Sequence, residues 1–471
     1  RILEQVYRYR DVKGGEHIFD RSADHKKAAD IAKECMVLLK NDGALPLPHS
    51  NAKIAFIGAF AKAPRIQGGG SSHINTGNIS NALDSAAKYS DVSYAEGYER
   101  ESNDTNPALL EEAVQLAADS DVAVIFAGLP DSFESEGYDR QHMRMPDCQN
   151  ELIDEICKVQ ENVIVVLHNG SPVEMPWNDK VSAVLEVYLC GEATGEATAD
   201  ILFGKANPCG KLAETIPMKL SDTPSYLTFP GDRHAEYNEG VFVGYRYYDK
   251  KEMAVRYPFG HGLSYTTFEY SDIKLSDTAV GDDDILTVNV VITNTGNCAG
   301  KEIVQLYVAD KSGFAVRPEK ELKDFIKIEL QPGERKTVTF RLDKRAFSYY
   351  NEELGDWYAP NGKYDIMIAS SSRDIRLTAE VTHKTAVKLP FVATENTVFG
   401  EFMDYAEGKA TIDLLFSKVA KGLLGGDHFE PEAVRSMMLR QIRSFGGISD
   451  ELLHQAVDML NKDFGGFKAQ M

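Results

Sequence analysis

Three carboxylates and an arginine gather in one short segment of this chain. Glu134, Glu136 and Asp139 lie within "LPDSFESEGYDRQHMRMP", residues 129–146, and Arg140 follows them. A carboxyl group acts as a general acid at neutral pH only if burial or a neighbouring carboxylate raises its pKa. The acidic side chains are near enough in sequence to crowd one another, and Arg140 could hold one of them ionised. The segment could therefore carry acid/base chemistry.

The same residues also fit an acidic loop that is simply solvated. Against that interpretation, Tyr138, Met143 and Met145 bring more apolar area than solvated loops usually carry. Long loops without secondary structure of their own are also functional more often than short connections. The residue types alone leave both interpretations open and name no reaction.

A second unusual segment, "RIQGGGSSHIN" at residues 65–75, is rich in glycine. Its glycines allow the backbone to approach a ligand closely, and Ser71 and Ser72 supply hydroxyl groups beside them. A phosphate cradle is one alternative, but neither GxxxxGK[ST] nor GxGxxG is present and no lysine follows directly. A plain tight turn is another. A serine nucleophile has no GxSxG motif to support it.

The elements around these segments predict a doubly wound parallel sheet. Continuous apolar runs bounded by Gly, Asp or Asn alternate with amphipathic helical patterns. The runs are 53–60, 92–97, 121–128, 162–170 and 181–189, and the helical patterns are 108–120 and 147–160. Runs that are apolar on both faces are typical of strands covered by helices on both sides. Ligands of such sheets bind beyond the carboxyl ends of the strands, where both unusual segments are expected.

The apolar period changes from 3.6 to 2 after about residue 270. In "LTVNVVITNTG", Val288, Val290 and Ile292 alternate with polar neighbours, and later segments repeat the pattern. Short alternating strands separated by Gly and Asn turns predict an antiparallel sandwich of about 100 residues.

A third composition, rich in Met, Leu and Gly, begins near residue 386. In "ISDELLHQAVDML", Ser449 is a candidate N-cap. One apolar face of the predicted helix holds Leu452, Leu453, Ala456, Val457 and Leu460. This face has to be covered, either by its own chain or across a two-fold homodimer, and the sequence leaves both open.

These patterns divide the chain into four parts. We expect a linker at 1–27, an α/β domain at 28–270, an all-β sandwich at 271–385 and a helical tail at 386–471. The chain opens at Arg1 in a helix-like stretch, so we expect part of the natural protein to precede it.

Charge and composition exclude some classes of partner. With 51 basic and 72 acidic residues the net charge is −21, which disfavours nucleic acid and anionic membranes. No apolar run approaches the roughly 20 residues of a membrane helix. The cysteines lack CxxC and zinc-site spacing, which favours buried thiols in a reducing cytoplasm over disulfides. They are Cys35, Cys148, Cys157, Cys190, Cys209 and Cys298.

Several motifs in order resemble one enzyme family. "ESEGYDR" followed by "MRMPDCQNELI" resembles the acid/base loop of glycoside hydrolase family 3 β-glucosidases. The segments 28–47, 65–75, 191–217, 237–250 and 257–270 are also similar to landmarks of that family. The sandwich, with "NTGNCAGKEIVQLYV" and "ELKDFIKIELQPGE", resembles the family's fibronectin type III-like domain.

The resemblance implies a mechanism and residues for it. The family takes its nucleophile from a (β/α)8 barrel and its proton donor from the following α/β domain. Carried over by position, the glutamate before Gly-Tyr-Asp-Arg is Glu136, and Ser71 and Ser72 match the sugar contact of the glycine-rich loop. The implied reaction is retaining hydrolysis of a terminal β-D-glucosyl residue without metal or cofactor. Glu134 is assigned no catalytic role.

One departure from the family pattern is large. The family's nucleophile is an aspartate before tryptophan on the barrel, and the only Asp-Trp pair here is Asp356-Trp357, within the sandwich pattern. Residues 1–22 resemble the linker that follows such a barrel. We therefore expect a cytoplasmic half-enzyme whose partners are a β-glucoside and a barrel domain or chain. A non-catalytic carbohydrate-binding module and a nucleotide-binding α/β protein remain alternatives.

Overall fold

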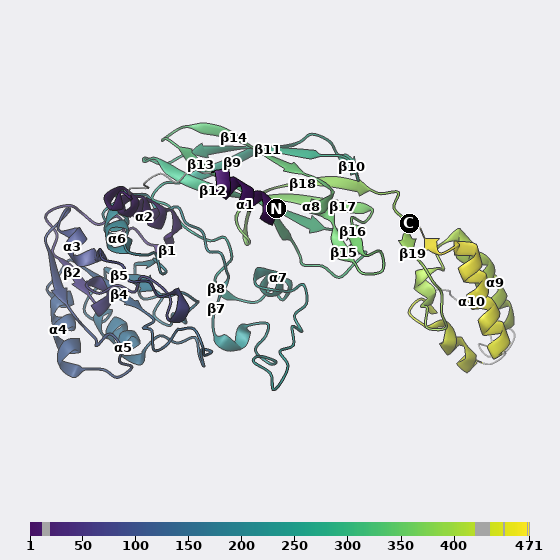
Figure 1. Cartoon of the computed structure of the whole chain (residues 1–471), viewed down its shortest axis with the longest axis horizontal. Helices are drawn as coiled ribbons and strands as arrows, with labels where there is room; N and C mark the ends of the chain where they lie inside the picture. Colours follow the sequence, from purple (N-terminus) through teal and green to yellow (C-terminus); the bar gives the residue numbers. More distant parts are fainter. Residues whose placement is uncertain (12–18, 420–433, 446–447, 469, 471) are drawn as a thin grey trace.

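The computed structural model describes residues 1–11, 19–419, 434–445, 448–468 and 470. In Figure 1 an α/β unit lies at the left, a β-sandwich runs along the top, and a small helical unit lies at the right. The predicted fold class, a doubly wound α/β domain followed by an all-β sandwich and a helical tail, is confirmed.

The α/β unit is built on a sheet with strand order β1-β6-β5-β4-β2-β3. Its strands are β1 (Val37–Asn41), β2 (Ile54–Ile57), β3 (Val92–Ala95), β4 (Val122–Gly128), β5 (Val163–His168) and β6 (Ala183–Glu186). Every residue of β2, β4, β5 and β6 is buried, which explains their continuous apolar runs. All five predicted runs form strands. The edge strand β1, antiparallel to β6, was not predicted.

Helices cover both faces of this sheet. They are α2 (Arg21–Cys35), α3 (Ala82–Ala86), α4 (Pro107–Ala118), α5 (Asp147–Ile156) and α6 (Thr194–Leu202). The helices α2 and α3 both contact α6, whereas α4 contacts α5, and the two groups lie on opposite sides of the strands (Figure 1). The helix α4 begins where the side chain of Asn106 accepts a hydrogen bond from the Ala108 N–H, with Pro107 in the first turn.

The order of the strands creates a switch point between β2 and β4. The chain passes from β2 to β3 on one side and then returns to place β4 on the other side of β2. Because β2 and β4 are parallel neighbours, the loops after them leave the sheet at the same edge and diverge. Open α/β sheets bind ligands at such a crevice. The glycine-rich segment follows β2 and the acidic segment follows β4.

Short elements connect the α/β unit to the sandwich. They are β7 (Ile216–Pro217), η3 (Leu220–Asp222), α7 (Tyr245–Lys250) and β8 (Val255–Tyr257), whereas η1 (Ala59–Ala61) and η2 (Gly70–Ser72) lie within the α/β unit between β2 and α3.

The sandwich packs two sheets, with strand orders β10-β18-β17-β12-β13 and β14-β11-β9. Val288, Val290 and Ile292 are buried between them, as their alternation predicts. The elements are β9 (Phe268–Leu275), β10 (Ala279–Gly281), β11 (Leu286–Asn294), β12 (Gly300–Asp310), β13 (Glu321–Leu330), β14 (Arg335–Leu342), α8 (Lys344–Phe347), β15 (Tyr349–Asn351), β16 (Asp356–Tyr358), β17 (Gly362–Ser371) and β18 (Asp374–Lys384).

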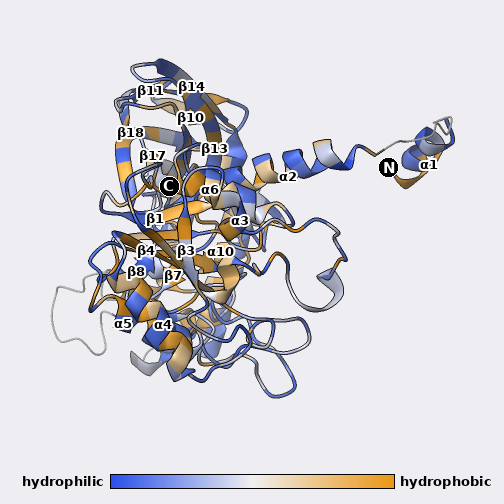
Figure 2. Ribbon diagram, turned by 90° about the vertical axis from the view of Figure 1, so that its left-hand side faces the viewer, coloured by the Kyte–Doolittle hydropathy of each residue, from blue (hydrophilic) through white to orange (hydrophobic). Residues whose placement is uncertain are grey.

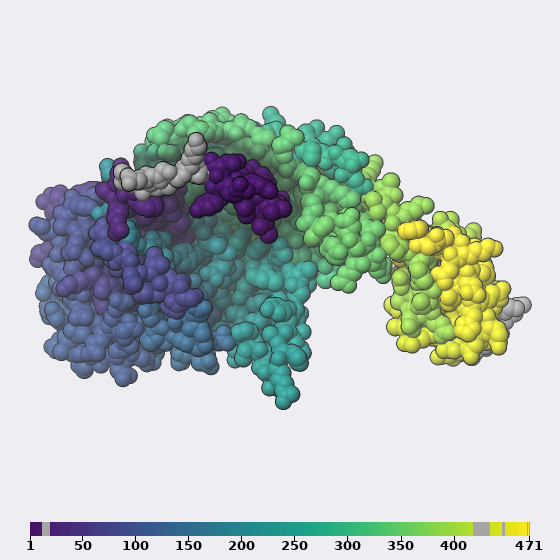
Figure 3. Space-filling model, viewed as in Figure 1, coloured from purple at the N-terminus to yellow at the C-terminus, as the bar shows by residue number. Residues whose placement is uncertain are grey.

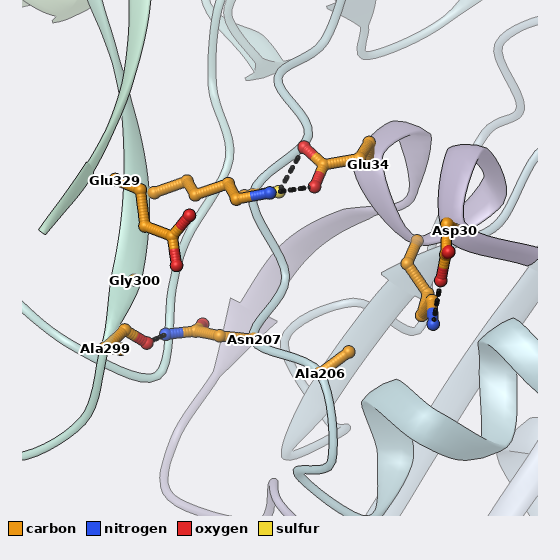
Figure 4. A pocket seen from close by; sticks show the side chains of 10 residues that line it. Asp30, Glu34, Ala206, Asn207, Ala299, Gly300 and Glu329 are labelled. Atoms are coloured by element: carbon orange, nitrogen blue, oxygen red, sulfur yellow. Dashed lines mark hydrogen bonds and ion pairs between the residues drawn. The ribbon is translucent and has the colours of Figure 1, made fainter. Parts of the chain in front are cut away.

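Charged side chains join the sandwich to the α/β unit. Glu34 near the end of α2 pairs with Lys301 from β12 beside a cavity of about 450 Å³ (Figure 4), and it also pairs with Lys327 from β13. Lys211 Nζ lies 3.0 Å from a carboxylate oxygen of Glu302 at the same junction. Burial alone would raise the pKa of Glu34, but hydrogen bonds from the two lysines lower it to about 2. Glu34 is therefore ionised at neutral pH, where it joins the two units through its ion pairs.

The C-terminal unit forms a separate lobe in Figure 3, with its own core. Its elements are β19 (Leu389–Pro390), η4 (Phe399–Glu401), η5 (Ala406–Gly408), α9 (Lys409–Val419), η7 (Leu439–Phe445), α10 (Asp450–Phe464) and β20 (Phe467–Lys468).

The predicted apolar face of α10 is covered by its own chain. Leu453 and Leu460 are fully buried, and Leu452 and Val457 pack against the same core. Ser449 caps the helix by accepting a hydrogen bond from the Leu452 N–H, as its sequence predicts. The structure thus favours packing within one chain over a homodimer as the cover for this face.

The helix α1 (Ile2–Asp11) has no buried residue and lies apart from the main body in Figure 2. The boundary expected after residue 27 falls inside the continuous helix α2. All cysteines are free thiols, but only Cys148 and Cys209 are buried, while Cys35 and Cys298 are exposed. None of the described helices combines the length and apolarity needed to cross a membrane.

Candidate functional site

The glycine-rich and acidic loops meet at the switch point of the sheet. The backbone N–H of Ser71, in η2, donates a hydrogen bond to Glu136 Oε2 at 2.5 Å. Gly70 has a positive φ of 87°, and a Cβ built there would lie 2.5 Å from the Glu136 side chain. Glycine at this position therefore allows both the turn and the close approach of the glutamate.

Glu136 is exposed and its pKa is lowered. Hydrogen bonds from the hydroxyl group and the N–H of Ser71 stabilise its ionised form. The prediction that neighbouring carboxylates raise the pKa of the loop's acid is therefore wrong for Glu136 in this chain. The side chain is a carboxylate at neutral pH, ready to accept a proton.

Glu134 is held by a buried arginine that the sequence did not single out. Arg65 is 2% exposed, and its Nη1 lies 2.6 Å from Glu134 Oε2 while its Nη2 donates to the Glu134 carbonyl at 2.7 Å. The same guanidinium donates to Asp131 Oδ1 at 2.9 Å and to the Leu129 carbonyl at 3.1 Å. Arg65 follows β2, so it ties the acidic loop to the start of the glycine-rich loop.

The remaining hydrogen-bond donors to the Glu134 carboxylate come from the loop after β5. The Gly170 N–H donates to Glu134 Oε2 at 2.8 Å, and the Ser171 hydroxyl donates to Oε1. Three strand ends are thus joined through one carboxylate. With its oxygens bound by an arginine, a backbone N–H and a hydroxyl, Glu134 is suited to hold the loop in place.

Arg140 does not have the predicted role. Its Nη1 donates to the Ser171 hydroxyl at 2.8 Å and to the Pro172 carbonyl at 2.9 Å, and it forms no ion pair among the described residues. Arg65, not Arg140, forms ion pairs with carboxylates of the loop. Asp139 is exposed.

The acidic loop is packed and not simply solvated. Met143 and Met145 are 6% and 1% exposed, and the Tyr138 hydroxyl donates to the Asp131 carbonyl at 2.8 Å. The apolar residues therefore anchor the segment, as the interpretation of it as an acid/base loop requires. The ordered backbone presents Glu136 to solvent at the edge of the sheet.

The two serines of the glycine-rich loop differ in their contacts. The Ser72 hydroxyl donates to the Gly68 carbonyl at 3.0 Å and so closes the turn. Both serines are exposed, and the Ser71 N–H contacts Glu136. The segment is a tight turn and also lies directly beside the candidate acid.

Sequence reasoning missed two buried titratable residues near this edge. Glu186 is 1% exposed at the end of β6, and burial raises its pKa to about 8 although Asn169 and the Tyr188 N–H donate hydrogen bonds to it at 3.0 and 2.9 Å. His168 ends β5, and burial lowers its pKa to about 3. The sequence signal that could have indicated Glu186 was its position as a charged residue inside the apolar run 181–189.

The Asp-Trp pair lies outside this site, and the described residues hold no candidate metal site. Asp356 and Trp357 belong to β16 in the sandwich, where the Arg345 guanidinium lies 3.1 Å from the centre of the Trp357 ring. Among the described residues no three His, Cys, Asp or Glu side chains are grouped as metal ligands.

Comparisons with known proteins identify the domains that carry this site. Residues 36–265 match the model of the glycosyl hydrolase family 3 C-terminal domain, and residues 302–372 match the fibronectin type III-like domain. The first match includes both loops and all six strands of the sheet.

Similar proteins are longer than this chain. A thermostable beta-glucosidase B of Acetivibrio thermocellus is 48% identical over 98% of this chain and 62% of its own length. An exo-alpha-(1->6)-L-arabinopyranosidase of Bifidobacterium breve is 42% identical over 82% of this chain and 52% of its own length. The solved GH3 beta-glucosidase of Bifidobacterium adolescentis superposes with a TM-score of 0.80 at 41% identity, over 87% of this chain and 61% of that one. The chain thus spans about half to three fifths of these relatives.

Proposed function

This chain belongs to glycosyl hydrolase family 3, and from that premise we propose that it supplies the acid/base half of a retaining β-glucosidase active site. Glu136 is the proposed general acid and base, and Ser71 and Ser72 are the proposed sugar contacts. In this division residues 28–270 carry the chemistry, while 271–385 and 386–471 serve stability and assembly.

One observation carries the proposal. The Glu136 carboxylate stands exposed at the switch point between β2 and β4, fixed by the Ser71 N–H from the neighbouring loop. It projects from a loop that Arg65 and Glu134 anchor. A proton-transfer group has to be held in place and reachable by substrate, and Glu136 meets both conditions.

The pKa of Glu136 has to rise before it can donate a proton. In a retaining site the second carboxyl stands about 5 to 5.5 Å away, and a like charge at that distance disfavours ionisation. A bound sugar also removes water from the carboxylate. Glu136 then protonates the leaving oxygen, and as a carboxylate it deprotonates the water that releases the sugar.

The second carboxyl is proposed to come from a (β/α)8 barrel. The described residues form no such barrel, and Asp356 lies in the sandwich. The proposed substrate is a terminal β-D-glucosyl residue. An L-arabinopyranosyl residue is the second candidate, since two relatives with 42% and 43% identity are named exo-alpha-(1->6)-L-arabinopyranosidases.

Nucleotide binding is disfavoured by the hydrogen bond between the Ser71 N–H and Glu136. In a phosphate cradle the backbone N–H groups of the glycine-rich loop bind the anion. Here the Ser71 N–H already bonds to a carboxylate, and Glu136 would repel a phosphate. Non-catalytic sugar binding is compatible with the chain alone.

Reconstitution tests the proposal. The purified chain should not hydrolyse an aryl β-glucoside by itself, because the covalent intermediate needs the other carboxyl. Addition of a barrel domain from a family member, as a separate chain or fused before Arg1, should produce turnover of a β-glucoside with a poor leaving group, and Glu136→Gln should remove this turnover. Turnover of an aryl β-glucoside by the verified pure chain, or turnover of the poorly activated β-glucoside that survives Glu136→Gln in the assembled enzyme, would contradict the proposed split site.

A further inference from the structure

A second cavity lies behind the acidic loop. It has a volume of about 350 Å³ and is lined by Arg140, His142 and Met143 of the loop, by Ser171 and Pro172, and by parts of the segment 214–248. Glu136, Ser71 and Ser72 do not line it. The cavity is therefore separate from the proposed catalytic face, although one loop borders both.

Three buried polar atoms in the residues that line this cavity have no partner. Arg140 Nη2, His142 Nδ1 and Thr215 Oγ1 make no hydrogen bond to any described residue. Buried polar atoms are nearly always hydrogen-bonded, and leaving one unsatisfied is unfavourable. The three side chains line one cavity, and small rotations of them would let a polar ligand there satisfy these atoms.

Much of the remaining wall is apolar. The side chains of Met143, Pro172, Pro217, Leu220 and Tyr248 contribute to it. A ligand that fits must therefore present C–H surface to these side chains as well as polar groups to the side chains of Arg140, His142 and Thr215. A pyranose ring or a polyol of similar size has this mixed character.

The charges in the wall favour a neutral ligand. Arg140 brings a positive charge and Glu214 a carboxyl group, and no described residue makes a hydrogen bond or ion pair with the Glu214 side chain. Burial, together with the nearby Glu134, raises the pKa of Glu214 to about 7. An anion would be repelled by the glutamates and a cation by Arg140. A hydroxyl group can accept from the arginine and donate to the carboxyl.

The cavity at the junction with the sandwich lacks these features. There Glu34 is paired with Lys301 and Lys327. In the same place Asn207 Nδ2 donates to the Ala299 carbonyl at 3.0 Å (Figure 4). None of the described residues that line it has a buried side-chain nitrogen or oxygen without a partner. Its polar groups are already satisfied within the chain.

We propose that the cavity bounded by Arg140, His142 and Thr215 binds one neutral sugar or polyol, at a site distinct from the Glu136 face. This site lies wholly within the described chain, so its test does not depend on the proposed function.

Ligand-observed NMR and calorimetry on the whole chain test the site, with glucose as the probe and inorganic phosphate as the charged comparison. Thr215→Val keeps the shape of the side chain and removes one hydroxyl, and should weaken glucose binding about fivefold. Leu220→Trp, at a half-buried position of the wall, should fill the cavity and abolish binding. Glu136→Gln is the matched control and should leave the affinity of this site unchanged.

Each outcome decides the matter. One glucose site that weakens in Thr215→Val and disappears in Leu220→Trp, with circular dichroism showing that both variants are folded, supports the proposal. Glucose binding that both variants retain and Glu136→Gln weakens would place the sugar on the catalytic face and overturn it. Binding of phosphate but not glucose, or no binding at millimolar glucose, would also overturn it. If Leu220→Trp does not fold, the isosteric Thr215→Val variant decides.

Discussion

Replacement of Arg65 by methionine should destabilise the α/β unit by about 3 kcal/mol. Arg65 is 2% exposed and the Glu134 side chain is 17% exposed, so the pair is shielded from water. Removing one partner of a buried ion pair costs about 3 to 5 kcal/mol, because the other charge is left without compensation. The lower end applies here, since Glu134 keeps its bonds from Gly170 and Ser171.

A double-mutant cycle isolates the contribution of the pair. Glu134→Gln removes the charge that Arg65→Met would strand, so the double variant should be about 2 kcal/mol more stable than the sum of the single effects implies. Arg256→Met is a matched control. Its partner Asp179 is 85% exposed at 3.4 Å, and a surface pair of this kind is worth about 0.5 kcal/mol.

Tryptophan fluorescence during urea unfolding is a suitable assay. Trp177 is fully buried in the α/β core, whereas Trp357 is 38% exposed in the sandwich. In a Trp357→Phe background the signal reports the α/β unit alone. An Arg65→Met effect no larger than that of Arg256→Met, or strictly additive effects of the Arg65 and Glu134 variants, would refute the role assigned to this clamp.

Three further predictions concern stability. Burial raises the pKa of Glu186 in the folded chain to about 8, above its ordinary 4.5, so the wild type should lose stability as pH rises from about 4.5 to about 8. Glu186→Gln should remove this slope in pH-dependent unfolding, with an upper limit of about 3 kcal/mol at pH 7, and an unchanged slope would contradict the assignment. The lysines lower the pKa of Glu34 to about 2. The contribution of Glu34 to folding stability is therefore complete above about pH 4.5 and is lost as pH falls toward 2. Glu34→Gln should lower the free energy of unfolding by about 1 kcal/mol at pH 7, a value reduced for solvent screening because the carboxylate is 38% exposed. An equal loss of stability in this variant at pH 2 would argue against the ion pairs. Leu453→Ala in the core of the C-terminal unit should lower the free energy of unfolding of that unit by about 2 to 5 kcal/mol. Protease should then cleave the C-terminal unit while the α/β unit stays folded. Simultaneous cleavage of both units would show that they unfold together.

The fold followed from local patterns in the sequence wherever burial imposes a period. The wholly buried strands β4 and β5 have continuous apolar runs, and Val288, Val290 and Ile292 alternate because one face of β11 is covered. The edge strand β1 was missed because "VLLKN" follows α2 directly and its polar end resembles a loop. The position of Glu136 could be predicted only from the family resemblance.

The network around the acid could not be predicted from the sequence. Arg65 and Glu134 are 69 positions apart, and nothing local indicates that their loops leave adjacent strands. Arg140, the nearer arginine in sequence, was the natural but wrong choice. The lowered pKa of Glu136 likewise depends on Ser71, 65 positions away. Contacts of this kind arise from strand order, which the apolar patterns do not specify.

Azide rescue tests the role of Glu136 most directly. In an assembled enzyme that contains the barrel, Glu136→Ala should lower kcat/KM for a glucoside with a poor leaving group by about 10² to 10⁴-fold, and kcat/KM for an activated aryl glucoside much less, because only the former needs protonation. The variant should also hydrolyse the covalent intermediate slowly, because no general base activates water, so turnover of the activated substrate is limited by this step. Added azide should restore turnover of the activated substrate and yield a β-glucosyl azide, since a small anion replaces the water that Glu136 would deprotonate. The same pattern in Glu134→Ala, with Glu136→Ala lacking it, would show that the acid/base is Glu134 and that the account given for the two carboxylates is reversed.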